Sequence, residues 1–245
     1  MLYGIINLIF CDRFEYLCNM KKQHRGFTLI ELLVVLGLMI IAFSYVIVNT
    51  INNQGMSLKS SQRILSAVAQ GAKGQAIMKQ APSRLIIYAD QGNDRDKNKY
   101  LRYFGIVTQD PQNPSRWIAG TEGTYLPKGI YFMPKLTEFS NGKNKRLGKM
   151  YLEYPRIKSK ESDPIFGEEY YYYEFNANGT MATNFVNAWL LFGAGTIESN
   201  GNRQFDISFD NPSLQELRSG LIFRKVGSTT LVTDSNQINR IIKKD

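Results

Sequence analysis

Cysteine and histidine are nearly absent from this 245-residue chain. The two cysteines, Cys11 and Cys18, and the one histidine, His24, all precede the apolar segment that begins at Phe27. If processing removes the residues before Phe27, the remainder can form no structural disulfide, no Cys/His zinc site and no histidine-activated nucleophile. We therefore expect a protein that is not an enzyme and that uses no metal or other cofactor.

Charge is scarce over one long stretch. The segment from Phe27 to Val48, FTLIELLVVLGLMIIAFSYVIV, has one ionisable side chain, Glu31, in 22 residues. As a helix it would measure about 33 Å, which is enough to cross the hydrocarbon core of a bilayer. A carboxylate near the centre of a membrane costs about 2.5 to 3.5 kcal/mol, so Glu31 is predicted to be functional and to need a partner.

The flanking charges orient this segment. Lys21, Lys22 and Arg25 precede it, and the next positive charge after it is Lys59. The positive-inside rule then places the N-terminus in the cytoplasm and the rest of the chain outside it. This pattern predicts a single-pass protein of the inner (cytoplasmic) membrane.

Two simpler interpretations compete with a functional membrane helix. A secretory signal peptide has an apolar region of about 7 to 15 residues and a small-residue cleavage site, whereas this run is longer and is followed by Asn49 to Asn52. A plain membrane anchor explains the apolar run but leaves Glu31 without a role.

The residues around Gly26 resemble a known family. The stretch from Lys21 to Leu33, KKQHRGFTLIELL, resembles the class III signal of type IV prepilins and type II secretion pseudopilins: a basic leader, Gly, Phe, then Thr-Leu-Ile-Glu. The resemblance implies that a prepilin peptidase cuts between Gly26 and Phe27 and N-methylates Phe27.

Each of these positions has a chemical reason of its own. Gly26 has no side chain to shield the bond that is cut. Glu31 lies one helical turn beyond Phe27, so it can pair with a terminal amine of its own chain or of a neighbour. The resemblance implies the neighbour, and hence a filament of pilins or pseudopilins held through this helix. It also implies an inner-membrane assembly platform and membrane lipid as partners.

The first 19 residues fit this leader poorly. Residues 1–26 are predicted to form the leader of this sequence. A leader that starts at Met20 would have the ordinary length for the family, so we expect Met20 to be the true start of translation. The alternative is a lipoprotein signal ending at Cys11, but Phe10 is too large for the position before a lipidated cysteine.

An apolar stripe continues the helical period beyond the membrane segment. Ile51, Leu58, Leu65 and Ala72 recur every seven residues, with small Gly55, Ala69 and Ala76 between them. Pro82 is incompatible with a helix interior. We expect one helix from Phe27 to Gln80, with a transmembrane part over 27–48 and an amphipathic part over 49–80 that packs on a sheet.

Residues 83–245 are predicted to form a β-rich extracytoplasmic head. Short β-prone runs alternate with polar, Gly or Pro punctuation. The runs are 85–88, 100–107, 130–133, 150–154, 170–175, 188–192, 205–209, 221–226 and 229–233. Asn178-Gly179 and Gly227-Ser228 are hairpin-turn signals. The fold class is therefore α+β, a pilin-like fold of one long helix on an antiparallel sheet.

Two further patterns suggest a subgroup. The segment 72–77 ahead of a first strand at Leu85, and the segment 175–179 ahead of the last strands, are similar to the minor pseudopilin H component and the T-type fimbrial minor pilins. The resemblance implies a structural minor pseudopilin of a type II secretion system or a related type IV pilus.

Asp94, Asp96 and Asn98 have the spacing that opens a calcium loop. Lys99 stands where that loop needs Gly, and Gly105 stands at the bidentate Glu position, so a solvated loop is the better interpretation. In the run Tyr170 to Tyr173, side chains of a strand alternate between faces, which favours sheet core over base stacking for half of them.

A net charge of +9 raises the alternative of nucleic acid as a partner. The candidate phosphate contacts are Lys143, Lys145, Arg146 and Lys149, with Arg240, Lys243 and Lys244 near the C-terminus. A solvated loop and tail is the interpretation we favour, because runs of charge usually serve solubility. The alternative function is a DNA-binding minor type IV pilin that acts in DNA uptake.

Overall fold

The computed structural model describes residues 28–51, 53–91, 97–140, 147–156, 167–199, 205–234 and 236–238. The chain divides into two compact units, Met1–Thr50 and Ile51–Asp245, which are described separately. The predicted leader and Cys11, Cys18 and His24 lie outside the described residues.

The first unit contributes helix α2, Leu29–Ile51. Burial is described for residues 29–40 of this helix, and all of them are exposed except Gly37, which is half-buried. Among the helices in the described ranges, none has both the length and the apolar character that a membrane crossing requires.

The second unit begins with helix α3, Asn53–Lys79. The expected apolar stripe is buried in its C-terminal part, where Leu65, Ala69, Ala72 and Ala76 are fully buried, whereas Leu58 and Gly55 are half-buried. The spacing of the four fully buried residues, which is four, three and four positions, keeps them on one helical face. Because three of the four are alanines, the backbone of α3 can approach the strands beneath it closely.

The end of α3 is set by a backbone cap one residue earlier than expected. Gln80 adopts the left-handed region, with φ 49°. Its N–H donates to the Ile77 carbonyl, and the Ala81 N–H donates to the Ala76 carbonyl over 3.2 Å. These two bonds make a Schellman cap, so the helix ends at Lys79. The single helix predicted over 27–80 is described as α2 and α3, on either side of residue 52, which lies outside the described residues.

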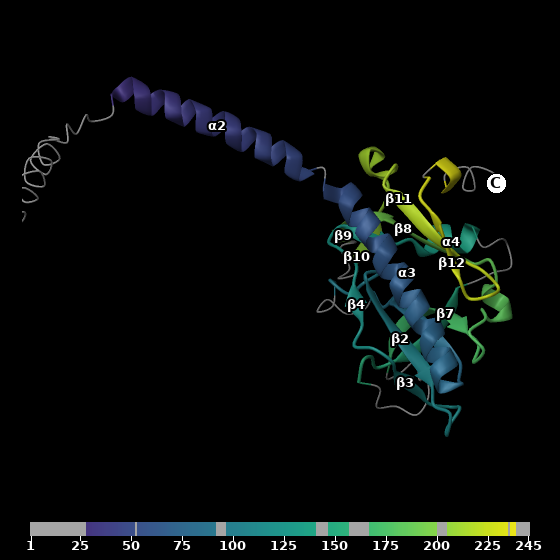
Figure 1. Ribbon diagram of the computed structural model, residues 1–245. Helices are drawn as coiled ribbons and strands as arrows, with labels where there is room; N and C mark the ends of the chain where they lie inside the picture. The colour runs from purple at the N-terminus through teal and green to yellow at the C-terminus, as the bar shows by residue number, and fades with distance from the viewer. Residues whose placement is uncertain are drawn as a thin grey trace, which may run out of the picture. The chain divides into compact units, whose positions relative to one another are not determined.

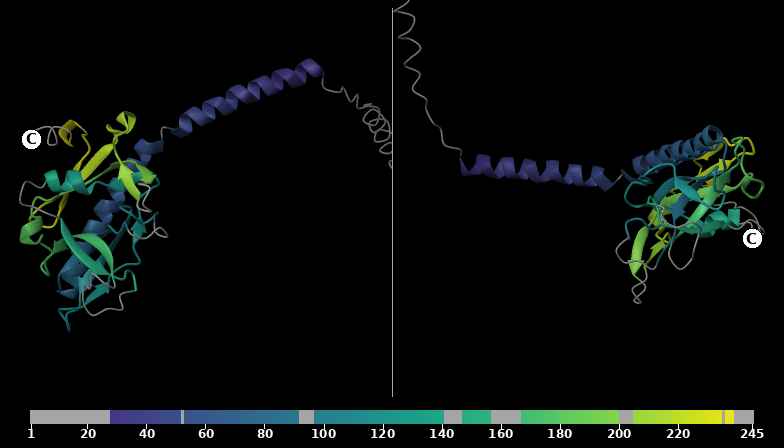
Figure 2. Two further views of the ribbon diagram at one scale, coloured as in Figure 1. Left: turned by 180° about the vertical axis from the view of Figure 1, so that it is seen from behind. Right: turned by 90° about the horizontal axis from the view of Figure 1, so that it is seen from below.

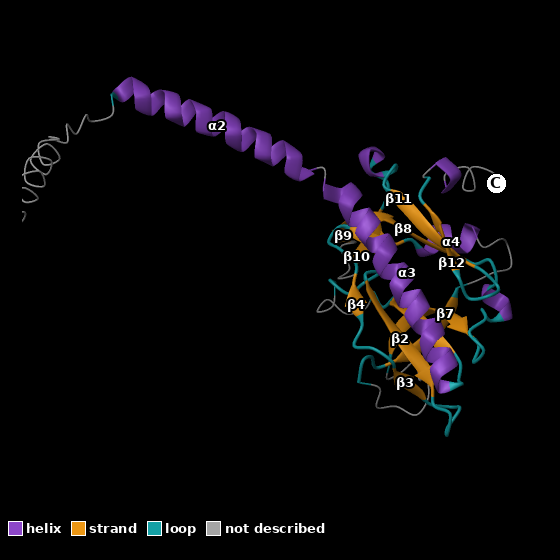
Figure 3. Cartoon of the chain, in the orientation of Figure 1, coloured by secondary structure: helices purple, strands orange, loops and turns teal. Residues whose placement is uncertain are grey.

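The strands of the second unit form two larger antiparallel sheets and a hairpin (Figure 3). The first sheet has the order β3-β2-β1-β7-β6, with β4 also paired to β2. Its strands are β1 Ser83–Tyr88, β2 Tyr103–Gln109, β3 Trp117–Ala119, β4 Thr124–Tyr125, β6 Gly148–Leu152 and β7 Glu168–Phe175.

The second sheet has the order β12-β11-β8-β5. Its strands are β5 Ile130–Phe132, β8 Trp189–Ala194, β11 Arg218–Phe223 and β12 Thr229–Val232. The hairpin pairs β9 Thr196–Ser199 with β10 Phe205–Ser208, and a short helix, α4 Pro134–Ser140, follows β5. Two 3₁₀ turns, Thr183–Phe185 and Pro212–Leu214, precede β8 and β11.

Helix α3 lies across both larger sheets. It contacts β1 and β2 of the first and β11 and β12 of the second, and Figure 1 shows it running along this face of the strands. Seen from behind, the strands stand in front of α3 (Figure 2, left). One continuous apolar core therefore joins the helix to both sheets.

The α+β class, with a helix packed on antiparallel strands, is confirmed. Each predicted β-run overlaps a strand, whereas β3, β4, β9 and α4 were missed. The prediction of one sheet was wrong, because the strands divide between two larger sheets and a hairpin. Twisted open sheets of more than about ten strands tend to split in this way.

Candidate functional site

Glu31 occupies the first turn of α2 and closes its N-terminus. The Thr28 hydroxyl accepts from the Glu31 N–H over 3.3 Å, and the Glu31 carboxylate accepts from the Thr28 N–H over 3.2 Å. The Thr28 hydroxyl also lies 3.2 Å from the same carboxylate oxygen. This reciprocal pair is a capping box, which satisfies backbone donors that the first turn would otherwise leave without acceptors.

The geometry directs the Glu31 carboxylate toward the start of the helix. Its oxygen reaches back to the N–H of Thr28, the residue that follows Phe27. The partial positive charge of a helix N-terminus favours an anion at this place. A positive charge placed on residue 27 would therefore lie beside a carboxylate that is already oriented. Gly26 and Phe27 themselves lie outside the described residues.

The surface of α2 next to Glu31 is apolar and exposed. Leu29 is 82% exposed, and most of the large apolar side chains described on this helix are more than half exposed. No described residue of the first unit packs over them. Such a surface is costly in water and is typical of a segment that meets lipid or another apolar helix.

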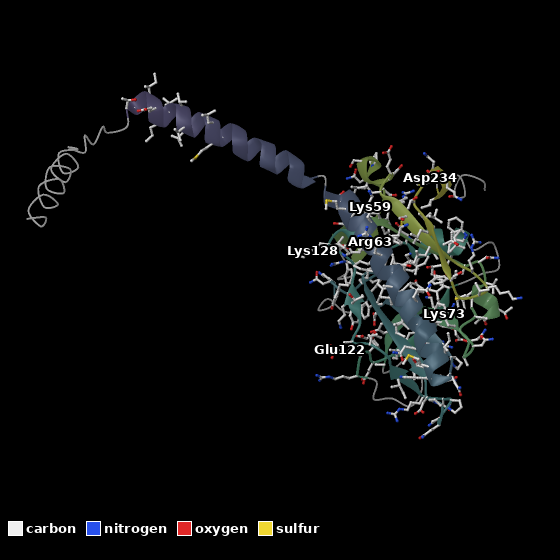
Figure 4. The ribbon with its side chains drawn as sticks, in the orientation of Figure 1. Lys59, Arg63, Lys73, Glu122, Lys128 and Asp234 are labelled. Carbon is white, nitrogen blue, oxygen red and sulfur yellow. The ribbon has the colours of Figure 1, made fainter. Side chains whose placement is uncertain are left out.

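Two turns, one containing Gly179 and one containing Gly227, lie next to the C-terminal part of α3. Lys73 donates from Nζ to the Val226 carbonyl over 3.0 Å (Figure 4). The Gly227 turn, closed by Arg224 and Ser228, connects β11 to β12 and confirms that hairpin prediction. The turn at residues 176–180 instead returns the chain to a single bridge between Phe175 and Met181, so a full hairpin there was wrong.

Of the basic residues proposed to contact phosphate, one is described, and it is already paired. Lys149 lies on β6, and its Nζ is 2.8 Å from the Glu169 carboxylate on β7. This bond raises the pKa of Lys149. The candidates Lys143, Lys145, Arg146, Arg240, Lys243 and Lys244 lie outside the described residues.

The calcium interpretation gains no support from the described residues. Asp94 and Asp96 lie outside them. Within the ranges that are described, no cluster of three or more His, Cys, Asp and Glu side chains is placed to hold a metal ion.

Half of the tyrosine run of β7 is fully buried, as expected, but the buried pair does not follow the expected alternation between faces. Tyr170 and Tyr173 are fully buried, and Tyr171 and Tyr172 are half-buried. The Tyr173 hydroxyl donates to the Trp189 carbonyl over 2.6 Å, and the Tyr170 hydroxyl donates to Glu168 over 2.9 Å. Burial raises the pKa of both tyrosines.

An arginine cluster in the first sheet was not anticipated. The Arg84 guanidinium lies 4.0 Å from the ring centres of both Trp117 and Tyr172, and its Nε is 2.6 Å from Glu174. The sequence signal for it was a lone charge in the otherwise apolar strand SRLIIY. Its aromatic partners come from β3 and β7, which only the register of the sheet brings together.

Comparison with known proteins supports the N-terminal assignment. The family model for the prokaryotic N-terminal methylation motif matches residues 21–47, which confirms the resemblance to type IV prepilins and pseudopilins. Among solved structures, the minor pseudopilin EpsH from the type 2 secretion system of Vibrio cholerae is similar at 9% identity. That similarity covers 72% of this chain and 96% of that one, with a TM-score of 0.35. No curated protein matches the chain. The chain thus carries a prokaryotic N-terminal methylation motif over residues 21–47.

Proposed function

We propose that this chain is a structural subunit of a filament assembled at the inner membrane, a minor pseudopilin of a type II secretion system or a related type IV pilus. Prepilin peptidase cuts it after Gly26 and methylates Phe27. Segment 27–48 anchors it in the membrane, with the head outside the cytoplasm. It is not an enzyme in this proposal, and its partners are other pilins or pseudopilins and the assembly platform.

The observation that carries this proposal is the placement of Glu31. Its carboxylate closes the first turn of an exposed apolar helix and lies within the matched methylation motif. In the precursor the Glu31 carboxylate accepts hydrogen bonds from the Thr28 N–H and hydroxyl. After cleavage a new terminal amine arises at Phe27, the residue that precedes Thr28 and lies one helical turn before Glu31. In a medium of low dielectric, a carboxylate and an amine attract each other strongly.

Pairing across to a neighbouring chain would fix the axial register of two helices. Van der Waals packing of the exposed leucine, isoleucine and valine side chains then supplies the contact area. In this mechanism the carboxylate specifies the position of the neighbour, and the apolar surface holds it there.

The test compares two replacements of Glu31. Glu31→Gln keeps the shape of the cap, because Gln serves in a capping box as Glu does, but it removes the charge. We expect both Glu31→Gln and Glu31→Ala to be inserted and cleaved at Gly26, and neither to enter filaments. Mass spectrometry of the N-terminal peptide reports cleavage, and crosslinking to neighbouring subunits reports assembly.

Thr28→Val serves as the matched control. It removes the hydroxyl of the cap, at a cost of about 1 kcal/mol of helix stability, and keeps the carboxylate. It should assemble as the unchanged protein does. Normal assembly of Glu31→Gln would refute the charge-pairing role, and an uncut N-terminus in the unchanged chain would refute the processing.

A further inference from the structure

A groove with a mainly apolar floor and a few polar side chains runs between α3 and the edge strand β12. Its volume is about 560 Å³, and its lining includes Lys59, Gln62, Arg63 and Ser66 from the helix, with Leu231 and Thr233 from the strand region. The Ser66 and Thr229 hydroxyls lie 3.3 Å apart and join the helix to the strand. The groove lies wholly within the second unit.

Two cations line this groove without a carboxylate partner in the described parts of the chain. Lys59 and Arg63 are exposed and lie one turn apart on the same face of α3 (Figure 4). Helix α3 contains no acidic residue at all. The acid nearest in sequence to the groove lining is Asp234, whose carboxylate accepts from the Asn236 N–H and stands apart from both cations (Figure 4).

A buried donor between the two cations also lacks an acceptor. Gln62 is 7% exposed, and its amide Nε2 has no hydrogen-bond partner within the described residues. A buried amide donor without an acceptor costs about 1 to 3 kcal/mol. Gln62 lines the groove together with Lys59 and Arg63. Two cations and an unsatisfied N–H at one place call for an anion with several acceptor oxygens.

We propose that this groove binds the phosphate of an anionic phospholipid headgroup. Lys59 and Arg63 supply the charge, and a rotation of the Gln62 amide toward the groove supplies a third donor. Arg presents paired N–H groups that match phosphate oxygens. The site holds the head against the membrane surface and relieves the unsatisfied amide.

The choice of a lipid as the source of the phosphate follows from reach, and it rests on the proposed membrane anchoring. Lys59 is eleven residues beyond Val48, where the proposed anchor ends. Eleven residues span about 17 Å as a helix and no more than about 40 Å fully extended. The membrane surface at the end of the anchor is therefore accessible to Lys59. Cations close to an anionic membrane contribute about a fivefold gain in affinity each.

The experiment measures how fast an amine-reactive reagent modifies each lysine of the full chain in lipid nanodiscs. Discs of phosphatidylcholine are compared with discs that also contain phosphatidylglycerol, and mass spectrometry reads each site. We expect modification of Lys59 to slow by about fivefold in the anionic discs. Lys79, at the other end of α3, is the internal control and should not change.

Variants distinguish specific binding in the groove from general electrostatic attraction to the anionic disc. Arg63→Gln and Gln62→Leu should each reduce the protection of Lys59, whereas Lys79→Gln should leave it intact. Arg63 is exposed, so its replacement leaves the fold undisturbed. Equal slowing at Lys59 and Lys79 would overturn the proposal, as would protection that survives in Arg63→Gln.

A further arm distinguishes the source of the phosphate. Millimolar inorganic phosphate is added to the phosphatidylcholine discs, and protection of Lys59 equal to that in anionic discs would overturn the lipid assignment. Co-elution of the chain with the discs is measured first. A chain that fails to co-elute refutes the anchoring and this inference together, whereas a co-eluting chain with unchanged Lys59 refutes only this inference.

Discussion

Arg84 shows how a single charged side chain stabilises the face of the first sheet. Its guanidinium is stacked between Trp117 and Tyr172 and paired with Glu174, and both charged side chains are about one-fifth exposed. A cation held over aromatic faces and away from water interacts more strongly than one on the surface. The cluster therefore connects three strands, β3, β1 and β7, through one side chain.

Arg84→Ala should lower the free energy of unfolding by about 2 kcal/mol, because it leaves Glu174 partly buried without its partner. Arg84→Lys should recover only part of this loss, since an ammonium cannot fill the stacked position. Lys149→Ala is the matched control: its pair with Glu169 is half-exposed on the lysine side, and its loss should cost less than about 1 kcal/mol. Urea unfolding of the three variants gives the comparison, and equal losses for Arg84 and Lys149 would contradict the role of stacking.

At the residue scale, sequence reasoning finds a group whose surroundings in the sequence are unusual. Glu31 was identified because it is the one charge in a long apolar run, and its role stays a prediction. Arg84 and Gln62 were missed. The partners of Arg84 come from distant strands, and Gln62 is an ordinary polar residue in a polar helix until the fold places it beside β12.

At the scale of elements, the turns and α3 determine each other's positions. The two turns that contain Gly179 and Gly227 meet, since a Cβ on Gly227 would overlap the Gly179 carbonyl, and both turns contact Lys73 of the helix. Gly227 also has a positive φ of 74°. A side chain there would meet both a backbone restriction and a neighbouring backbone atom.

Gly227→Ala should therefore destabilise the head by more than about 3 kcal/mol, from left-handed strain plus the clash with Gly179. Gly129→Ala is the control, because Gly129 has a similar φ of 84° but open space around its Cα. It should cost only the backbone strain, about 1 to 2 kcal/mol. Thermal unfolding followed by circular dichroism measures both, and equal losses would mean that the contact between the turns contributes nothing.

Elements with strong periodicity were predicted well. The seven-residue stripe located the buried face of α3, and β-branched and aromatic runs located most strands. The short strands β3, β4 and β9 have two to four residues each, too few for an alternating pattern to be recognised. The division into two sheets depends on pairing between distant strands, such as β5 with β8, which no local pattern specifies.

At the scale of the whole molecule, the core is rich in tyrosine. Tyr88, Tyr170 and Tyr173 are among its largest fully buried side chains. Desolvation raises the pKa of Tyr170, Tyr173 and Tyr154 above the ordinary value of 10.0, and it does the same for Tyr100 and Tyr103. The fold therefore retains phenol protons that the unfolded chain would release.

This retention predicts alkaline unfolding. Below pH 10 these tyrosines are protonated in both states, so their contribution to stability is fully present. Above it the unfolded chain binds fewer protons, and stability falls by about 1.4 kcal/mol for each pH unit and each tyrosine until the folded pKa is reached. Urea unfolding between pH 8 and pH 11 measures this slope.

Tyr173→Phe provides the control for the alkaline transition. It removes one buried phenol together with its bond to the Trp189 carbonyl. The variant should be less stable at pH 8. Above pH 10 its free energy of unfolding should fall less steeply, by about 1.4 kcal/mol per pH unit, which is the contribution of one tyrosine. A slope identical to that of the unchanged chain would remove Tyr173 from the titrating group.

The position of α3 across both sheets has a consequence for the order in which the head folds. Ser66 meets Thr229 across 163 positions of sequence, so the helix is synthesised long before its last partner strand. Contacts this distant must overcome a large loop-closure entropy before they contribute, which makes folding slow. Until β11 and β12 arrive, part of the alanine-rich face of α3 remains uncovered. If the head is exported as proposed, a route that accepts an incompletely folded chain would suit it.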